Sequence, residues 1–359
     1  MDATVKMIKE LSELHGAPGF ERDVRKKMEE YLLPLSDEVI TDRLGGIVGK
    51  KTGEAQGPKI MLVGHLDEVG WMVTHVTKGG FLRIQPLGGW WPHVMLGQRV
   101  RIRTRKNGEH IGLIGSKAPH VLKVEDRAKV LEMKDMFIDV GAKSREEIEE
   151  MGIRPGDPIT PEADFFEMRD GAFWAGKALD NRAGCALAVE VMKRLQEENH
   201  PNVVYSGATV QEEVGSRGAI TISNLVNPDI AFALDVGIAY DTPGFELYPR
   251  DVKMDEGPLA MIFDAKMIPQ VGLRDLVMDT AKELGIHLQV DALAGGATDG
   301  ANTHIHGIGC PTIAMGFALR YIHTHTAMMS RKDFEQAADL VAAVIKKLDN
   351  KVLEEILDR

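Results

Sequence analysis

Histidines and acidic residues follow several apolar segments of this sequence, and these residue types are common protein ligands of divalent metal ions. Glu212 and Glu213 come directly after the apolar segment 203–210, which has the composition of a buried strand. Two adjacent carboxylates at the end of such a strand are unfavourable unless metal ions or protons neutralise them. His65 follows the apolar segment 60–64 in the same way. The pattern predicts a metal site.

Two further apolar segments are followed by residues of the same types. Asp235 comes directly after segment 230–234, and His323 comes shortly after segment 311–315. Ligands of open α/β sheets gather at the carboxyl ends of the strands. We therefore expect these side chains to meet at one edge of a sheet.

Asp180 differs from the others because it precedes a predicted helix. Helical periodicity runs from Asn181 to about Gln196, and a helix N-cap is a sufficient explanation for a lone aspartate at this place. A carboxylate held at a helix start can also bridge two cations with its two oxygens. Both explanations stay open for this residue taken alone.

The other candidate residues also have explanations that need no metal, and each is reasonable when the residue is considered alone. The metal site is favoured because all of these independent explanations would otherwise have to hold together. The alternatives are a core or loop histidine for His65, a turn cap for Asp67, a turn start for Asp235, a solvated pair for Glu212 and Glu213, and a surface loop for His323.

Composition narrows the class of protein. The chain has 359 residues, 44% of them hydrophobic, and a formal net charge of -11, which disfavours nucleic acid or an anionic membrane as partner. No apolar run approaches the ~18 residues of a membrane span. The amphipathic start has no features of a secretory signal, so we expect a cytoplasmic protein. Cys185 and Cys310 lie in apolar surroundings and are expected to be free, buried thiols.

Strands and helices alternate along most of the chain, with one interruption. Residues 69–162 contain short alternating or β-branched segments separated by glycine-rich turns, which is typical of a small β-barrel or sandwich. We predict an α/β catalytic domain formed by residues 1–68 and 163–359, with a β-barrel domain inserted at 69–162. The last helix is predicted over 332–357, with one apolar face.

These motifs occur in an order that resembles the co-catalytic metallo-aminopeptidases, a family that includes bacterial glutamyl aminopeptidase and the archaeal tetrahedral (TET) peptidases. Some members have been named cellulases or endoglucanases. The resemblance covers essentially the whole chain and implies a mixed sheet with helices on both faces, as in zinc exopeptidases, carrying the inserted barrel. It rests on residues 65–67, 179–182, 211–215, Asp235, 296–300 and 320–324.

The resemblance implies a centre of two divalent metal ions in each chain. One ion takes His65 and Asp235, the other takes Glu213 and His323, and Asp180 bridges both. Each ion then has three protein ligands, which leaves positions for water, as in catalytic zinc sites. Zinc is the expected metal, with cobalt and manganese as alternatives for such nitrogen and oxygen ligands.

The resemblance also assigns two residues that bind no metal. The sequence alone does not decide whether Glu212 or Glu213 is the general base, and the family pattern gives that role to Glu212. Asp67, two residues after His65 on the same strand face, is expected to accept a hydrogen bond from the imidazole and orient it.

The implied function is removal of N-terminal residues from short peptides. The alternatives are a related di-metal amide hydrolase, which acts on acyl-amino acids or carboxy-terminal bonds, and a non-catalytic scaffold or cellulose-binding protein. Substrate preference is less defined, because Arg250, Lys253 and Arg320 suit an acidic side chain whereas 293–296 would form a roomy apolar wall. We expect broad specificity.

The barrel supplies no predicted ligand, so we expect it to form a subunit interface. Trp90, Trp91 and Met95 are an apolar cluster that a monomer would not leave exposed, unless the cluster packs inside the barrel. The resemblance implies homo-oligomers in which dimers, paired through this domain, close into a tetrahedral dodecamer that admits only short or unfolded peptides.

Overall fold

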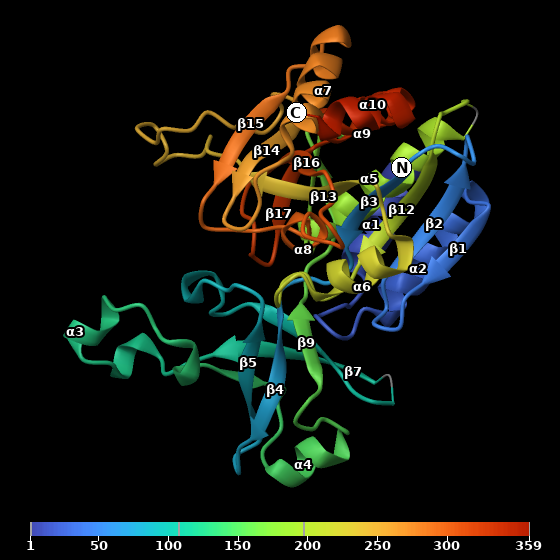
Figure 1. The fold of residues 1–359 in the computed structure, drawn as a ribbon. Coiled ribbons are helices and arrows are strands. Elements are labelled where there is room, and N and C mark those ends of the chain that lie inside the picture. The colour runs from blue at the N-terminus through green and yellow to red at the C-terminus, as the bar shows by residue number, and fades with distance from the viewer. Residues whose placement is uncertain (1, 107, 197, 359) are drawn as a thin grey trace.

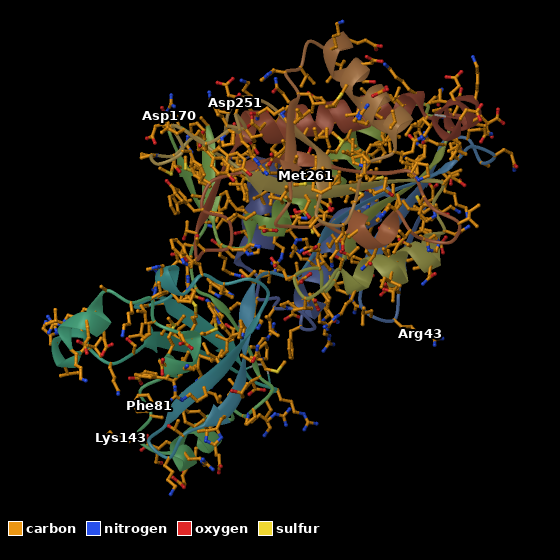
Figure 2. All side chains as sticks on the ribbon, turned by 60° about the vertical axis from the view of Figure 1, so that its left-hand side comes forward. Arg43, Phe81, Lys143, Asp170, Asp251 and Met261 are labelled. Atoms are coloured by element: carbon orange, nitrogen blue, oxygen red, sulfur yellow. The ribbon has the colours of Figure 1, made fainter. Side chains whose placement is uncertain are left out.

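The computed structural model describes residues 2–106, 108–196 and 198–358. It has two parts: an α/β part in the upper half of Figure 1 and a β-barrel below it. Both chain termini lie in the α/β part, whereas the barrel is built from the middle of the N-terminal half. Figure 2 shows the same separation, with Phe81 and Lys143 in the barrel and Met261 in the α/β part.

The α/β part is organised around an eight-stranded mixed sheet. Its central strands β12, β3, β13 and β16 are neighbours and run parallel, so their carboxyl ends lie along one edge. In spatial order the strands are β1 (Glu38–Thr41), β2 (Ile47–Thr52), β12 (Val203–Thr209), β3 (Lys59–His65), β13 (Ile230–Ile238), β16 (Thr312–Leu319), β14 (Leu259–Asp264) and β15 (Gln289–Leu293).

Helices cover both faces of this sheet, as predicted. Side chains alternate along β3, so Ile60 and Leu62 pack into the main core while Met61 and Val63 face the other side. The main core is covered by α1 (Ala3–Glu13), α2 (Arg22–Leu32), α5 (Leu179–Leu195), α7 (Val271–Glu283), α9 (Arg331–Lys347) and α10 (Asn350–Leu357). The other face carries α6 (Arg217–Val226) and the short α8 (Gly300–Thr303).

The prediction of one helix over 332–357 is wrong. Helix α9 ends at Lys347, Leu348 leaves the helical region, and Asp349 starts α10 by accepting a hydrogen bond from the Val352 amide at 2.8 Å. The aspartate therefore acts as an N-cap in the middle of the apolar pattern. The predicted apolar face of α9, which includes Phe334 and Ile345, is buried.

The inserted barrel is confirmed. All of its strand pairs are antiparallel, and the barrel closes in the order β4-β5-β8-β7-β6-β9. Its strands are β4 (Gly70–Val76), β5 (Phe81–Leu87), β6 (Arg99–Arg103), β7 (Glu109–Gly115), β8 (Phe137–Asp139) and β9 (Pro158–Pro161). They lie inside the predicted insertion 69–162. That this segment is a dimerisation domain stays a prediction.

Short elements complete the two parts. A three-stranded sheet joins β10 (Phe166–Met168), β11 (Phe173–Gly176) and β17 (Ala327–Ser330), and it leads the chain into α5 and away from the His323 loop. None of the described helices is long and apolar enough to cross a membrane. The remaining short helices are the 3-10 helices η1 (Leu33–Leu35), η2 (Pro92–Val94), η3 (Pro119–Val121) and η4 (Met133–Asp135) and the α-helices α3 (Val124–Arg127) and α4 (Arg145–Glu150).

The predicted apolar cluster of the barrel is divided. Met95 is fully buried in the barrel core, and Trp90 is half-buried against Trp71, so these two side chains do not form an exposed patch. Trp91 is 62% exposed. The expectation of a shared exposed surface is therefore wrong for Met95 and holds for Trp91.

Candidate metal centre

Four neighbouring strands bring the predicted ligands to one edge of the sheet. His65 is the last residue of β3, and Glu212 and Glu213 follow the end of β12. Asp235 lies within β13 rather than after it, which corrects the predicted strand end. Strand β13 continues to pair with β16 beyond this point, although its pairing with β3 ends at Ala233. The Asp235 carboxylate therefore lies where β13 separates from β3.

Asp180 is not an N-cap. Its backbone is non-helical, and the neighbouring Asn181 takes the capping role by accepting a hydrogen bond from the Gly184 amide at 3.0 Å. The Asn181 amide group also donates to the carbonyl of Leu234 at 2.8 Å, which ties the start of α5 to β13. Both carboxylate oxygens of Asp180 are therefore available to the centre.

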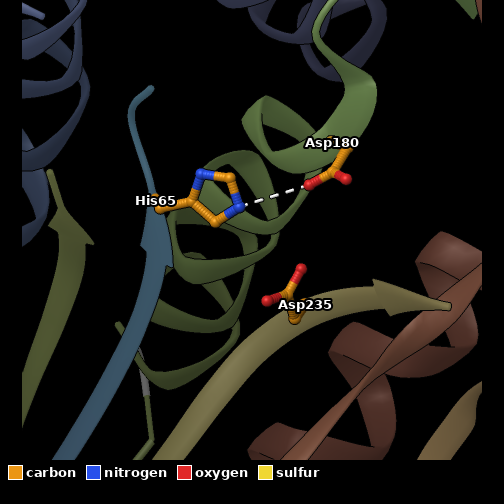
Figure 3. Close-up of side chains that lie close together, drawn as sticks. All are labelled: His65, Asp180 and Asp235. Atoms are coloured by element: carbon orange, nitrogen blue, oxygen red, sulfur yellow. Dashed lines mark ion pairs between the residues drawn. The ribbon is translucent and has the colours of Figure 1, made fainter. Parts of the chain in front are cut away.

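The two oxygens of Asp180 face two different histidines. His65 Nε2 lies 3.2 Å from Oδ1 (Figure 3), and His323 Nε2 lies 3.2 Å from Oδ2. Two ligand atoms on a tetrahedral zinc ion, with bonds of ~2.0–2.1 Å, stand about 3.3 Å apart. The spacing on each side of Asp180 is that of two ligands sharing one ion.

The predicted ligands lie in two groups that share Asp180. In each group one possible ligand atom from every residue lies within 4.8 Å of the others. The first group contains His65, Asp180 and Asp235 (Figure 3), and the second contains Asp180, Glu213 and His323. Both groups match the sets predicted from the sequence.

Glu212 belongs to neither group. Its Oε2 lies 3.9 Å from His65 Nε2, while its Oε1 accepts a hydrogen bond from the Ser216 hydroxyl at 2.9 Å. One oxygen is thus held by the protein and the other faces the centre. Such a carboxylate is placed to accept a proton rather than to bind an ion.

Asp67 contacts both the histidine and the glutamate pair. The closer acceptor to His65 Nδ1 is the Asp67 backbone carbonyl at 3.1 Å, and the carboxylate Oδ1 lies at 3.5 Å. The two carboxylate oxygens accept the amides of Glu212 and Glu213, each at 3.0 Å. Asp67 therefore fixes the turn that carries the glutamates, in addition to its place beside the imidazole.

Several groups of the centre have raised pKa values in the absence of metal cations. Burial, followed by the charge of Asp180, raises the pKa of Glu213 well above its usual range, and burial likewise raises the pKa of Asp235. Although burial opposes it, hydrogen bonding to Asp180 raises the pKa of His323 to about 10. Protons are thus retained on groups that must lose them to bind a metal.

The donor set fits divalent cations. Glu213 Oε1 is buried and has no hydrogen-bond partner among the described residues, which is costly for a carboxylate oxygen unless a cation satisfies it. Two neutral imidazoles and three carboxylates supply nitrogen and oxygen ligands of the kind that zinc, cobalt and manganese accept.

Close packing of α5 against β3 places Asp180 opposite His65. A Cβ added at Gly64 would lie 2.6 Å from the Cys185 amide nitrogen, and one added at Gly184 would lie 2.3 Å from the Leu234 carbonyl oxygen. The fully buried Arg182 then donates to the carbonyl of Leu66 at 2.6 Å, which fixes the turn after His65. Small residues and one buried guanidinium therefore set the distance between helix and strand.

A cleft of about 690 Å³ opens over the centre. Arg250 lines it but is paired with Asp291 at 3.1 Å, and Arg320 is paired with Asp241 at 2.7 Å, so neither is a free cation. Lys253 does not line the cleft, whereas Lys266 does and has no ion-pair partner among the described residues. Lys266 could not be identified from residue patterns, because its position in the cleft depends on where β14 ends.

Two other residues of the site were not predicted from the sequence. Ser216 contacts Glu212, and Asp299 accepts a hydrogen bond from the Thr209 hydroxyl beneath it. Burial, followed by the charge of Glu212, raises the pKa of Asp299 to about 8. Asp299 lies in the motif 296–300 that carried the family resemblance, which was the only signal for it.

A sequence model of the family described as M42 glutamyl aminopeptidase matches residues 45–340, which is well over half of the chain. The chain belongs to this family. Two M42 relatives are similar over nearly their whole length. The glutamyl aminopeptidase of Lactococcus lactis is 34% identical over 97% of this chain and 98% of its own. The lysyl aminopeptidase of Pyrococcus furiosus is 31% identical over 96% and 97%.

Solved structures give the same family and fold. A TET aminopeptidase from a marine sediment archaeon of the Thaumarchaeota is 42% identical, with a TM-score of 0.95 over 98% of both chains. The TET1 peptidase of Pyrococcus horikoshii, described as able to assemble into a tetrahedron or a large octahedral shell, is 28% identical, with a TM-score of 0.84 over 96% of this chain and 100% of its own. The M42 chain described here is therefore a peptide-bond hydrolase of the aminopeptidase class.

Proposed function

We propose that this chain removes N-terminal residues from peptides with two divalent ions held at the centre and Glu212 as general base. The observation that carries the proposal is the position of Asp180, whose two oxygens face the imidazoles of His65 and His323 at equal distances of 3.2 Å. A single carboxylate placed in this way is suited to bridging two ions.

The proposed roles of the residues follow from their contacts. His65 and Asp235 would hold one ion and Glu213 and His323 the other. Two such ions supply a more acidic water and an electrophile for the scissile carbonyl. The free oxygen of Glu212 would hold the proton of the attacking water and pass it to the leaving amine, while Ser216 keeps the other oxygen in place.

The acidic surroundings favour a free amino terminus over a blocked one. Glu212, Glu213 and Asp235 all line the cleft, and an ammonium group close to several carboxylates is stabilised by their charge. An acyl-amino acid lacks this cation, and a peptide that is cleaved at its carboxy-terminal bond carries it away from the scissile bond. The acidic lining therefore supports the aminopeptidase over that alternative.

The cleft supports broad acceptance of the first side chain, with acidic side chains included. Leu293 and Met261 provide apolar wall, Tyr240 and Tyr248 provide stacked rings at 5.1 Å, and Lys266 provides an unpaired cation. The names of the relatives do not narrow the expected substrate preference, since one is a glutamyl and another a lysyl aminopeptidase.

The test is a panel of aminoacyl-anilides assayed with metal-free protein that has been reloaded with zinc, cobalt or manganese. We expect turnover of free-amino substrates to vanish with chelator and to return with metal, and the N-acetylated substrates to remain uncleaved. Cleavage of the acetylated substrates at comparable rates would contradict the exopeptidase assignment.

We also propose that the chain is a homo-oligomer, with a tetrahedral dodecamer as the assembled form. Large apolar side chains are exposed on both parts, including Ile308 and Ile268 on the α/β part and Val121 and Val124 beside the barrel. The TET1 relative assembles into closed shells. Light scattering on metal-loaded protein tests this: a monomer at micromolar concentration would contradict the interfaces, and a stable dimer would contradict only the shell.

We propose that the protein is cytoplasmic. Cys185 and Cys310 are both buried and unpaired, and burial raises the pKa of each thiol to about 12. Thiols in this state suit a reducing compartment, where disulfides are rare. Fractionation of cells that express the tagged protein is the direct test.

A further inference from the structure

The barrel reaches the metal centre through one loop. Residues 88–91 connect β5 to η2, and the carbonyl oxygen of Gly89 lies 2.8 Å from His323 Nδ1. His323 Nε2 faces Asp180 and Glu213. A histidine that binds a metal through Nε2 carries its proton on Nδ1, so His323 donates this hydrogen bond to the barrel.

The same loop also approaches the second ligand of this half of the centre. A Cβ added at Gly88 would lie 3.0 Å from Glu213 Oε2 and 2.7 Å from Val69 Cγ1. Gly88 has a φ of +88°, which other residues rarely adopt. The sequence at this position therefore permits the barrel backbone to lie directly against Glu213.

Trp90 fixes the loop to the barrel. Its ring stacks on Trp71 with the centroids 4.1 Å apart, and its Nε1 donates to the carbonyl of Gly70 at 3.2 Å. Trp71 belongs to β4 and is fully buried. Trp90 directly follows Gly89 in the chain, so the packing of Trp90 in the barrel core sets the position of the Gly89 carbonyl.

His325 gives the barrel a second contact with the His323 loop. Its ring centroid lies 5.5 Å from that of Trp90 and 6.0 Å from that of Trp71. The side chain is buried, and neither ring nitrogen has a hydrogen-bond partner among the described residues. His325 therefore packs as a ring against the two tryptophans, and the loop is held by the barrel at two residues.

Within the part of the chain that the structure describes, His65 has no hydrogen bond from the barrel. The partner of His65 Nδ1 is the carbonyl of Asp67 at 3.1 Å, which lies in the turn directly after β3. We propose that Trp90 is a positioning residue that orients His323 through the Gly89 carbonyl, so that the barrel controls one of the two metal sites and not the other. The proposal rests on the proposed function, because it takes His323 as a metal ligand.

The experiment is a calorimetric titration of metal-free protein with Co²⁺, comparing Trp90→Ala with Trp91→Ala. Trp91 is the neighbouring residue and is 62% exposed, and among the described residues its ring pairs with His93 and not with Trp71, so its variant is the matched control. In Trp90→Ala we expect the first ion to bind as in the unmodified protein and the second to bind roughly 10- to 100-fold more weakly. Excess metal should restore its turnover with an unchanged KM for peptide.

Three further variants sharpen the result. Trp90→Phe keeps the stacked ring and loses the indole donor, so we expect an intermediate loss. His325→Phe keeps the ring contact and should bind both ions as the unmodified protein does. Gly89→Ala would place a Cβ 3.2 Å from His323 Nδ1 and should weaken the second ion selectively, which provides a test if Trp90→Ala fails to fold.

Native affinity for both ions in Trp90→Ala, or an equal loss of both, would overturn the positioning role. If Trp90→Ala does not fold, native affinity for both ions in Gly89→Ala overturns it instead. If the unmodified protein and Trp91→Ala bind no metal, the failure belongs to the proposed function and not to Trp90.

Discussion

The two halves of the proposed metal centre are built on different kinds of backbone. His65 and Asp235 stand on adjacent strands β3 and β13, and their side chains are only 2% and 8% exposed. His323 lies in the loop between β16 and β17 with a side chain that is 37% exposed, and Glu213 lies in the turn after β12. We refer to these as the strand-held half (His65, Asp235) and the loop-held half (Glu213, His323).

The geometry of each half is set by a different kind of contact. The register of the sheet fixes the strand-held half, because Ala233 pairs with Val63 and so brings Asp235 level with His65. The loop-held half depends on contacts from outside its own segments, namely Asp67 for the glutamate turn and Gly89 for His323. A preorganised set of ligands binds an ion more tightly, so we expect the two halves to differ in affinity.

The largest effect is expected from Asp180, the one residue that both halves share. Asp180→Ala removes the oxygen that faces each histidine, so both ions should be lost and turnover should fall to background. Metal analysis of the purified variant by mass spectrometry measures this. Retention of two ions would show that the halves do not depend on a shared bridge.

Glu212 should separate catalysis from metal binding in both halves at once. Glu212→Gln should reduce turnover roughly 100- to 10,000-fold, because the proton acceptor is lost, while both ions stay bound. Turnover and metal content are measured on the same sample, with Glu213→Gln beside it. If Glu212→Gln lost metal and Glu213→Gln kept it, the roles of the two glutamates would be reversed.

Metal affinity should rise with pH. Without metal the pKa of His323 is raised to about 10 by its hydrogen bond to Asp180, and the pKa of Glu213 is raised by burial. Binding must displace the proton of His323, so below pH 10 its release strengthens apparent affinity by about tenfold per pH unit, and a proton released from Glu213 adds to this dependence. Titrations in buffers of different ionisation enthalpy count the protons. Affinity that is independent of pH between 6 and 8 would contradict this account of the metal-free centre.

Ser216 should give the smallest effect. Ser216→Gly removes the hydroxyl that holds Glu212 and suits the positive φ of 50° at this position, so the variant should fold. We expect kcat to fall roughly tenfold, since a hydrogen bond to a charged group contributes about 1.5 kcal/mol, with KM and both ions unchanged. The control is Ser223→Ala, a buried serine of α6 that contacts Thr303 instead. Equal loss in both variants would point to a general effect on α6.

Most of the fold and the ligand types could be predicted from the sequence, because both depend on local patterns. Apolar segments marked the strands, and the order of the strands in the sheet then brought His65, Asp235 and the residues after β12 and β16 together. The closed barrel was likewise predictable from its short alternating segments and turns.

The contacts that complete the centre could not be predicted. The carbonyl of Gly89 is 234 residues away from His323 in the sequence, and a backbone acceptor leaves no residue-type signal. The prediction of an exposed cluster around Trp90 was partly wrong. Whether a ring packs inside a barrel depends on how the barrel closes, and here closure brings Trp71 against Trp90. Asn181 could have been identified as the cap, since its side chain and the Gly184 amide have the usual N-cap spacing.

The most direct test of the difference between the halves is a titration of metal-free protein with Co²⁺, followed by absorbance and calorimetry, in the unmodified chain and in His323→Ala. We expect two ions per chain to bind in two separate phases, and His323→Ala to keep the tighter phase and lose the weaker one. The strand-held half would then be the tighter site. Fully active protein with one ion or none would contradict the two-metal centre, and loss of the tighter phase in His323→Ala would contradict the assignment of the halves.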